Sequence, residues 1–346
     1  MEEVVLTGLR TNGEYHLGNY IGALLPMLQL VEKKREGGDY RINLFAPDLH
    51  SFTTPIDHSG LYKQTMANLR LFAAAGLPLD DPAVSLYRQS RIPAHSELTW
   101  ILSNFAGFGD LSRMVEFKEK TAALGGEERI GVGLFTYPIL MAADILLYDA
   151  KWVPVGDDQR QHLEFCRRLA RSFNQKFDTD VFTVPADFAE QQAWLGREMA
   201  PRIRSLRRPE RKMSKSVEDP GGTIMLSDPA EAAGKKIMAA ETDNFANIDY
   251  DWENRPGITN LLAILAALSG RPQAEINREW QGSGDYRALK TAVATVVSAT
   301  LERLQNGLSG VSEAALGEHL SEREARLAEI ASGKLAAVQK LVGLRE

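Results

Sequence analysis

Apolar residues in the N-terminal part of the chain fall into two kinds of run, which predict alternating strands and helices. Short runs rich in branched and aromatic residues predict strands at 4–7, 42–46, 83–87 and 152–155. Apolar residues three and four positions apart predict helices between them, for example at 21–31, 61–75, 95–105 and 137–148. Strands that alternate with helices favour an α/β fold with a doubly wound, parallel, Rossmann-like sheet, which binds ligands at the carboxyl ends of its strands.

The pattern becomes mostly helical in the C-terminal part of the chain. Apolar residues recur at helical spacing from Ile258 to Leu268 and again from Leu327 to Leu341. A Pro-Gly-Gly run at 220–222 is typical of a boundary. We therefore expect an α/β domain at residues 1–220 and a helical region at 221–346, with a last helix able to pack back on the first domain.

The composition limits the kinds of partner and the cellular compartment that we expect for the protein. The chain has 346 residues, 44% of them hydrophobic, which suffices for a sizeable core. A formal net charge of −6 excludes a polycation, so a nucleic-acid partner would meet local basic patches. The single cysteine, Cys166, excludes an internal disulfide, and the sequence has neither a signal peptide nor the roughly 18 consecutive apolar residues of a membrane span. We therefore expect a cytoplasmic protein without a membrane partner.

The segment 202–215 is strongly basic. It holds seven lysine or arginine side chains and one acid, Glu210, and it leads into the run Lys-Met-Ser-Lys-Ser at 212–216. A solvated basic loop is the ordinary explanation of such a run. Lys212 and Lys215 also suit a leaving pyrophosphate, because its negative charge grows as the bond to the α-phosphate breaks.

A glycine-containing turn follows the first predicted strand and leads into a helix. It reads Leu-Arg-Thr-Asn-Gly-Glu-Tyr-His-Leu-Gly-Asn-Tyr at 9–20. Free N–H groups at a helix start attract phosphates, and Gly18 leaves room for an adenine or a ribose against the backbone. The alternative is that Gly13 and Gly18 only shape the turn.

One carboxylate interrupts the apolar helical run 135–148. Tyr137, Met141 and Asp144 stand at positions i, i+4 and i+7, so they share one helix face. Burying Asp144 costs on the order of several kcal/mol unless a group donates hydrogen bonds to it. A ligand N–H could be that donor; an arginine or the start of another element is the alternative.

The predicted strand 152–155 leads into a second glycine turn, at 156–162. Acids such as Asp157 and Asp158 are ordinary at a helix start. Asp158 and Gln159 also offer what an α-ammonium group and a ribose hydroxyl need. We expect His162 to be a structural histidine.

Together these segments resemble the class I aminoacyl-tRNA synthetases, and nearly the whole chain resembles their bacterial tryptophanyl branch. His-Leu-Gly-Asn at 16–19 is similar to the HIGH motif, with asparagine in place of the last histidine, and 212–216 is the KMSKS motif. The tryptophanyl branch is further indicated by Phe-Lys-Glu-Lys at 117–120, by 137–148, by Val-Pro-Val-Gly-Asp-Asp-Gln-Arg-Gln-His at 153–162 and by Arg202-Ile203.

The resemblance implies an enzyme that makes tryptophanyl-adenylate and pyrophosphate from L-tryptophan and ATP with Mg²⁺, and then charges tRNA(Trp). It implies that Asp144 receives the indole N–H, which would reject competitors that lack one, and that Tyr137, Asp158 and Gln159 hold the α-ammonium group. The implied tryptophan site further includes Leu6, His50, Met141, Val153 and Val155. The implied ATP site includes Arg10, His16, Gly18, Asn19, Gly156, Asp158, Ile203, Met213 and Ser214.

The remaining implications concern catalysis and assembly. Lys120, Lys212 and Lys215 would act on the phosphates as the catalytic residues, without a metal site built from protein ligands. The helical region 221–346 would bind the anticodon, and the family leads us to expect a homodimer.

Some positions depart from the family's usual residues and leave alternatives open. Arg10 stands where glutamine is common, and His16 replaces a frequent threonine. Pro47 replaces a branched apolar residue, so Pro47 and Leu6 could reshape the pocket enough to admit ring-substituted tryptophans. Lys120 could equally lie on a solvated helix turn. Three other functions stay open: a tyrosyl enzyme of the same fold, a nucleotidyltransferase that uses no tRNA, and a synthetase paralogue that acts as a binding or regulatory partner.

Overall fold

A parallel sheet of three strands forms the centre of the N-terminal part. The computed structural model describes residues 2–11, 13–53, 56–124, 131–196, 202–214 and 219–346, with only the backbone at 120 and 122–124. The strands, in the spatial order β1-β2-β3, are β1 (Glu3–Gly8), β2 (Tyr40–Ala46) and β3 (Val84–Arg88). Both pairings are parallel, with Leu6 opposite Asn43 and Leu44 opposite Leu86. The predicted parallel sheet is confirmed.

The fourth predicted strand, 152–155, pairs with β1 at a single residue. Trp152 forms an isolated parallel bridge with Val5, in which the Leu6 N–H donates to the Trp152 carbonyl at 2.8 Å and the Trp152 N–H donates to the Val4 carbonyl at 3.1 Å. The next N–H needed to continue this ladder would belong to Pro154, which has none. The segment therefore extends the sheet without forming a strand.

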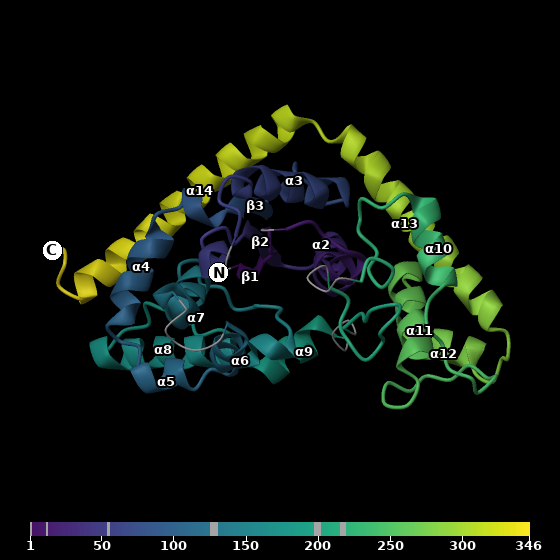
Figure 1. Cartoon of the computed structure of the whole chain (residues 1–346). Coiled ribbons are helices and arrows are strands. Elements are labelled where there is room, and N and C mark those ends of the chain that lie inside the picture. Colours follow the sequence, from purple (N-terminus) through teal and green to yellow (C-terminus); the bar gives the residue numbers. More distant parts are fainter. Residues whose placement is uncertain (1, 12, 54–55, 125–130, 197–201, 215–218) are drawn as a thin grey trace.

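The strands bury both of their faces, as a doubly wound fold requires. Neighbouring residues of β1 go to opposite sides: Val5 belongs to one apolar cluster and Leu6 to another. Leu44 and Phe45 of β2 divide in the same way. Helices pack on each face, with α3 above the strands and α7 and α8 below them in Figure 1.

The helices before the basic segment are short to medium in length. A continuous helix joins α1, a π-helical turn at Tyr20–Leu24 and α2. Its parts and the helices that follow are α1 (Leu17–Asn19), α2 (Leu25–Arg35), α3 (Leu61–Ala74), α4 (Ala94–Ser103), α5 (Phe108–Ser112), α6 (Val115–Leu124), α7 (Val132–Leu146), α8 (Arg160–Phe177) and α9 (Phe188–Leu195). Single 3₁₀ turns lie at His50–Thr53, Gln89–Arg91 and Asp157–Gln159.

The C-terminal part is helical, and its apolar residues share one cluster with those of the N-terminal part. Its helices are α10 (Ala230–Met238), α11 (Pro256–Ser269), α12 (Gln273–Trp280), α13 (Tyr286–Gly310) and α14 (Glu313–Leu341). Ile258 of α11 and Val297 of α13 belong to the cluster that also contains Val5 of β1 and Leu24. None of the helices described is both long enough and apolar enough to cross a membrane.

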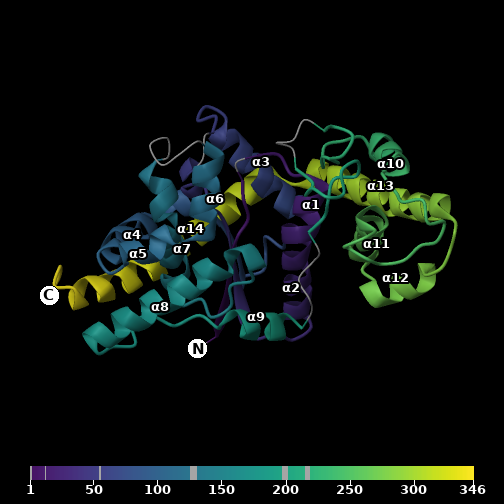
Figure 2. The ribbon, with the colours of Figure 1, turned by 60° about the horizontal axis from the view of Figure 1, so that its bottom comes forward.

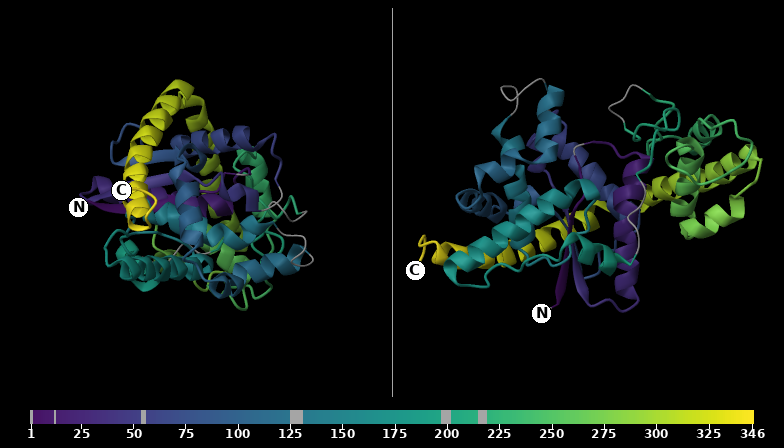
Figure 3. Two further views of the ribbon diagram at one scale, coloured as in Figure 1. Left: turned by 90° about the vertical axis from the view of Figure 1, so that its left-hand side faces the viewer. Right: turned by 90° about the horizontal axis from the view of Figure 1, so that it is seen from below.

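The last two helices form an arch over the molecule. Figure 1 shows α13 rising from the helical part and α14 descending across the N-terminal part, and Figure 2 and the right-hand view of Figure 3 show the pair running along the length of the molecule. Helix α14 lies along the outer edge of β3: the Leu86 N–H donates to His319 Nε2 at 3.0 Å and the Arg88 N–H donates to Glu324 Oε1 at 3.1 Å. Side chains of α14 thus satisfy edge groups of β3 that pair with no further strand among the described residues.

Candidate functional site

A cavity of about 660 Å³ opens at the carboxyl ends of β1 and β2. It lies where the end of β1, the turn after β2, helix α7 and the segment after Trp152 meet, which is the usual ligand position in such a sheet. The residues singled out from the sequence that line it are Leu6, Arg10, Pro47, His50, Tyr137, Met141, Asp144, Val153, Val155, Gly156, Asp158, Gln159 and Lys212.

Asp144 is a buried carboxylate among the cavity's lining residues, with only 1% of its surface exposed. Its Oδ1 accepts hydrogen bonds from Gln89 Nε2 at 2.7 Å and His95 Nδ1 at 2.6 Å, and its Oδ2 lies 2.9 Å from His50 Nε2. Burial opposes ionisation of this carboxyl, but the hydrogen bonds from His50 and His95 outweigh it and hold the pKa at about 2. Asp144 is therefore a charged acceptor at neutral pH.

A second set of polar side chains surrounds Tyr137, which is on helix α7 about two turns before Asp144. The Tyr137 hydroxyl donates to Glu116 Oε2 at 2.7 Å and lies 2.7 Å from His162 Nε2. Gln159 Nε2 also approaches Glu116 Oε2, at 3.4 Å. Burial and the Glu116 carboxylate raise the pKa of Tyr137, so this tyrosine stays neutral. Two carboxylates in the cavity lining, Glu116 and Asp158, make the region around Tyr137 suitable for a cation.

Apolar side chains form part of the cavity wall. Leu6, Met141, Val153, Val155 and Phe45 line the cavity. Pro47, which the sequence singled out as unusual, is in the lining as well. A flat aromatic ring between such walls would reach Asp144 at one edge.

The His-Leu-Gly-Asn turn is held by reciprocal hydrogen bonds at the start of α1. His16 Nδ1 accepts from the Asn19 N–H at 3.2 Å, and Asn19 Oδ1 accepts from the His16 N–H at 3.2 Å. A side chain at Gly18 would meet the His16 ring at 3.1 Å and Met213 Cβ at 3.5 Å. Gly18 therefore brings the turn close to the KMSKS segment.

The KMSKS segment begins in a short antiparallel pairing with residues 203–205. The Met213 N–H donates to the Ile203 carbonyl at 3.0 Å, and Arg204 and Lys212 form an antiparallel bridge. The side chains of Ile203 and Met213 are buried in the apolar core. Lys212 lines the cavity, and the Ser214 carbonyl accepts from Thr223 Oγ1 at 3.1 Å.

The chain after the basic segment is tied to the N-terminal turn. The Leu17 N–H donates to the Ile224 carbonyl at 2.8 Å, and the Leu226 N–H donates to the Tyr15 carbonyl at 3.0 Å. The two segments similar to the class motifs therefore lie close together, although about half of the chain separates them in sequence. Lys212 lines the cavity, whereas residues 16–19 do not. Lys215 lies outside the described residues, and Lys120 is placed on α6 by its backbone alone.

Several residues at the cavity or its carboxylate were missed from the sequence, among them Glu116, Gln89 and His95. Gln89 follows β3 and His95 begins α4, so neither lies near Asp144 along the chain. A usable signal existed, because a polar residue at the carboxyl end of a parallel strand lies at the ligand edge of the sheet. Gln89 after β3 and His50 after β2 both fit this rule.

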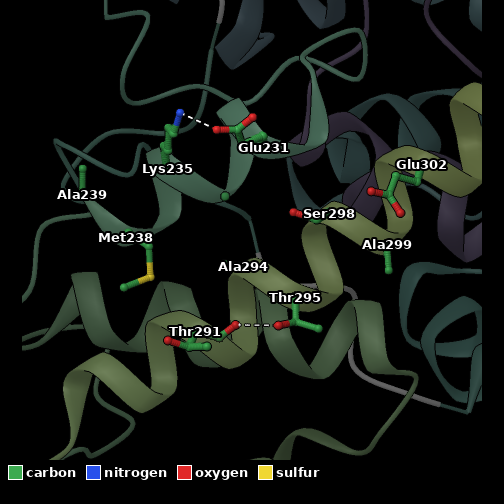
Figure 4. Close-up of a pocket in the computed structure, with 11 residues that line it drawn as sticks. Glu231, Lys235, Met238, Ala239, Thr291, Ala294, Thr295, Ser298, Ala299 and Glu302 are labelled. Atoms are coloured by element: carbon green, nitrogen blue, oxygen red, sulfur yellow. Dashed lines mark hydrogen bonds and ion pairs between the residues drawn. The ribbon is translucent and has the colours of Figure 1, made fainter.

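A larger open groove, of about 900 Å³, runs between α10 and α13, away from these residues. Figure 4 shows its lining, in which alanine, serine and threonine side chains accompany Met238 and a Lys235 to Glu231 ion pair of 2.6 Å. None of its lining residues is one that the sequence singled out. It has neither the buried carboxylate nor the lysine of the sheet cavity.

The chain matches a known protein family over most of its length. Residues 2–303 match the family model described as tRNA synthetases class I (W and Y). A tryptophan–tRNA ligase of Caldanaerobacter subterraneus subsp. tengcongensis is 39% identical over 340 residues, which are 98% of either chain. One of Leifsonia xyli is 43% identical over 332 residues, 95% of this chain and 93% of that protein.

Solved structures of the same kind share the fold. The crystal structure of tryptophanyl-tRNA synthetase from Mycoplasma pneumoniae superposes with a TM-score of 0.83 at 32% identity, covering 100% of this chain and 99% of the other. The Campylobacter jejuni enzyme complexed with ADP and tryptophan superposes with a TM-score of 0.74 at 29% identity, covering 98% and 99%. The resemblance read from the sequence is thereby confirmed.

Proposed function

We propose that this chain is a tryptophan–tRNA ligase, because it belongs to the class I tRNA synthetases for tryptophan and tyrosine. It would activate L-tryptophan with ATP to give tryptophanyl-adenylate and pyrophosphate, and then transfer the tryptophanyl group to tRNA(Trp). The observation that carries this proposal is Asp144, an ionised and buried acceptor at an apolar cavity beside the KMSKS segment.

Asp144 would choose tryptophan by accepting the indole N–H. A substrate without that N–H, such as phenylalanine, would leave a buried charge short of a hydrogen bond, and such a mismatch can discriminate by about 10⁴. Leu6, Met141, Val153 and Val155 would contact the ring. Tyr137 and Gln159 would hold the α-ammonium group, and the Glu116 carboxylate beside them supports this assignment.

The ATP side of the cavity would be formed by the two motif segments. Gly18, Asn19 and Gly156, with the backbone of Ile203 and Met213, would take the adenosine. His16, Arg10, Asp158 and Ser214 would complete the ATP contacts. Lys212, which lines the cavity, supports a phosphate site there, and we propose Lys215 and Lys120 as the other phosphate lysines.

Magnesium would arrive as part of the MgATP substrate. The described residues contain no group of three or more His, Cys, Asp or Glu side chains that could hold a metal. Mg²⁺ commonly binds through substrate phosphates and water, with few protein ligands. Such a metal would neutralise phosphate charge while the residues of this chain position the substrates.

No protein nucleophile is needed for the first step. The carboxylate of tryptophan attacks the α-phosphate, and the bond to pyrophosphate breaks. Tyr137 and Asp144, which both line the cavity from helix α7, would fix the amino acid so that its carboxylate faces the α-phosphate. The lysines would stabilise the charge that grows on the leaving pyrophosphate. The adenylate then passes its acyl group to the terminal ribose of tRNA(Trp).

The macromolecular partners follow from the same family. We propose that region 221–346 contacts the anticodon of tRNA(Trp), that the enzyme works in the cytoplasm, and that it is a homodimer. Large apolar side chains exposed on neighbouring helices support the homodimer: Trp100, Phe108, Val115 and Val132 are between 57% and 76% exposed.

ATP–pyrophosphate exchange tests the proposed function. The wild type should exchange with tryptophan and at least about 10³-fold less efficiently with tyrosine or phenylalanine. Lys212→Ala should lower kcat by about 10²-fold or more, because a charge at the leaving group is lost. Lys235→Ala, on the α10–α13 groove, is the matched control and should leave kcat unchanged. Exchange with tyrosine in preference to tryptophan would overturn the proposal.

A further inference from the structure

The carboxylate of Asp144 has two oxygens with different surroundings. Oδ1 accepts from Gln89 Nε2 and from His95 Nδ1, and both of these side chains are completely buried. Oδ2 has one hydrogen-bond partner among the described residues, His50, whose side chain is 19% exposed at the cavity. A carboxylate oxygen can accept about two strong hydrogen bonds. Oδ1 is therefore filled from inside the protein, and Oδ2 has capacity left on the cavity side.

A second hydrogen bond fixes the orientation of the His95 ring. Its Nε2 lies 2.8 Å from the hydroxyl of Tyr148, which is in the turn that follows helix α7. Because an ionised Asp144 can only accept, the His95 nitrogen that faces it, Nδ1, carries the hydrogen. With both ring nitrogens held, His95 cannot turn away from Oδ1 without losing two buried hydrogen bonds.

The three donors come from three separate parts of the chain. His50 lies in the 3₁₀ turn after β2, Gln89 in the turn after β3, and His95 in the first turn of α4. Gln89 and His95 are too deeply buried to touch a substrate, so any effect they have on recognition must pass through Asp144.

We propose that Gln89 and His95 are positioning residues for amino-acid selection: by occupying Oδ1 they fix the carboxylate plane and leave Oδ2 as the oxygen that accepts the substrate's ring N–H. This inference rests on the proposed tryptophan activation. It differs from a purely structural role, in which the two residues would only satisfy a buried charge. A structural role predicts equal damage to every substrate, whereas positioning predicts damage confined to substrates that carry the N–H.

The test compares tryptophan with 3-(3-benzothienyl)alanine, in which sulfur replaces the indole N–H. ATP–pyrophosphate exchange gives kcat/KM for each in the wild type, His95→Phe and Gln89→Met. We expect both variants to lower kcat/KM for tryptophan by about tenfold or more and that for the thienyl analogue by less than about threefold, since one buried hydrogen bond is worth roughly tenfold to a hundredfold.

Two further variants sharpen the result. His95→Asn keeps a donor near the Nδ1 position and should restore most of the preference for tryptophan. His319→Phe removes another buried histidine, which bonds to β3 and to Leu79, and it should leave the ratio of the two substrates unchanged. If His95→Phe does not fold, Gln89→Met and His95→Asn still decide the question.

The two possible negative results contradict different proposals. Absence of tryptophan-dependent exchange in the wild type would overturn the proposed function itself. Wild-type activity combined with an unchanged substrate ratio in Gln89→Met and His95→Phe would leave that function intact and overturn the positioning role.

Discussion

A buried carboxylate that stays ionised is the residue on which the site depends. Asp144 keeps its charge because His50, Gln89 and His95 surround it with donors, and a charge in that place would otherwise cost several kcal/mol, on the order expected for an unpaired buried ion. The hydrogen bonds that stabilise the charge of Asp144 also fix the orientation of its carboxylate. Stability and recognition are therefore coupled at this one side chain.

Asp144 should also make the stability of the protein depend on acid. Its folded pKa of about 2 lies below the ordinary value of 3.8, so the contribution is present above pH 4 and is lost as the pH falls toward 2. The difference corresponds to about 2 kcal/mol. In urea titrations, the wild type should therefore lose its stability advantage over Asp144→Asn between pH 5 and pH 2.

The control for this titration is Asp39→Asn, at an exposed position. It removes an exposed acid in place of a buried one, so comparison of the two variants separates burial of the carboxylate from its mere loss. A wild-type advantage over Asp144→Asn that does not shrink with acid would mean that the carboxyl is neutral in the fold.

The sequence showed that Asp144 needs hydrogen-bond donors, but it did not show which residues donate. Its place in an apolar helical run requires donors, and this follows from sequence alone. Which residues donate depends on how three turns converge at one edge of the sheet, and hydrophobic periodicity carries no such information. Pro154 is the opposite case: its missing N–H could have shown in advance that 152–155 would not be a full strand.

At the scale of elements, helix α14 serves as the cover of the sheet edge. Arg88 at the end of β3 donates to Glu324 from its backbone N–H, from Nε at 2.7 Å and from Nη2 at 2.8 Å. This carboxylate raises the pKa of Arg88, so the guanidinium stays charged. His319 completes the contact, and burial lowers the pKa of its imidazole, which suits the neutral ring that accepts from Leu86.

The Arg88 to Glu324 pair should behave as a buried pair in a double-mutant cycle. Glu324→Leu alone should cost about 3 kcal/mol, because it leaves the guanidinium and a strand N–H without their acceptor. Arg88→Met with Glu324→Leu should cost clearly less than the sum of the two single changes. Urea midpoints for the four proteins measure the coupling, and strict additivity would contradict it.

At the scale of the whole molecule, the two structural parts share their apolar core. Helix α11 packs with α2 and β1 in one cluster, and the backbone pairing of 224–226 with 15–17 joins the two parts. The sequence predicted the change from mixed to helical structure, and helices α10 to α14 confirm it. The return of the last helix to β3 joins positions 236 apart, which local patterns do not specify.

The exposed apolar residues of α4 to α7 predict how copies of the chain associate. Trp100, at 74% exposure, and Phe108, at 75%, would be covered in the proposed homodimer. Trp100→Glu should therefore shift the protein toward monomer in sedimentation equilibrium. Phe245→Glu alters another exposed aromatic residue, in the helical region, and should leave the mass unchanged. A wild type that is monomeric at micromolar concentration would contradict the homodimer.

The arch of α13 and α14 has a consequence for the chain while it is being made. The outer edge of β3 has no cover until Glu324 leaves the ribosome, 236 residues after Arg88. At about 5–20 residues per second, that interval lasts roughly 10 to 50 seconds. During that time the nascent sheet presents an open strand edge, and a message truncated before α14 would yield a chain that keeps it permanently.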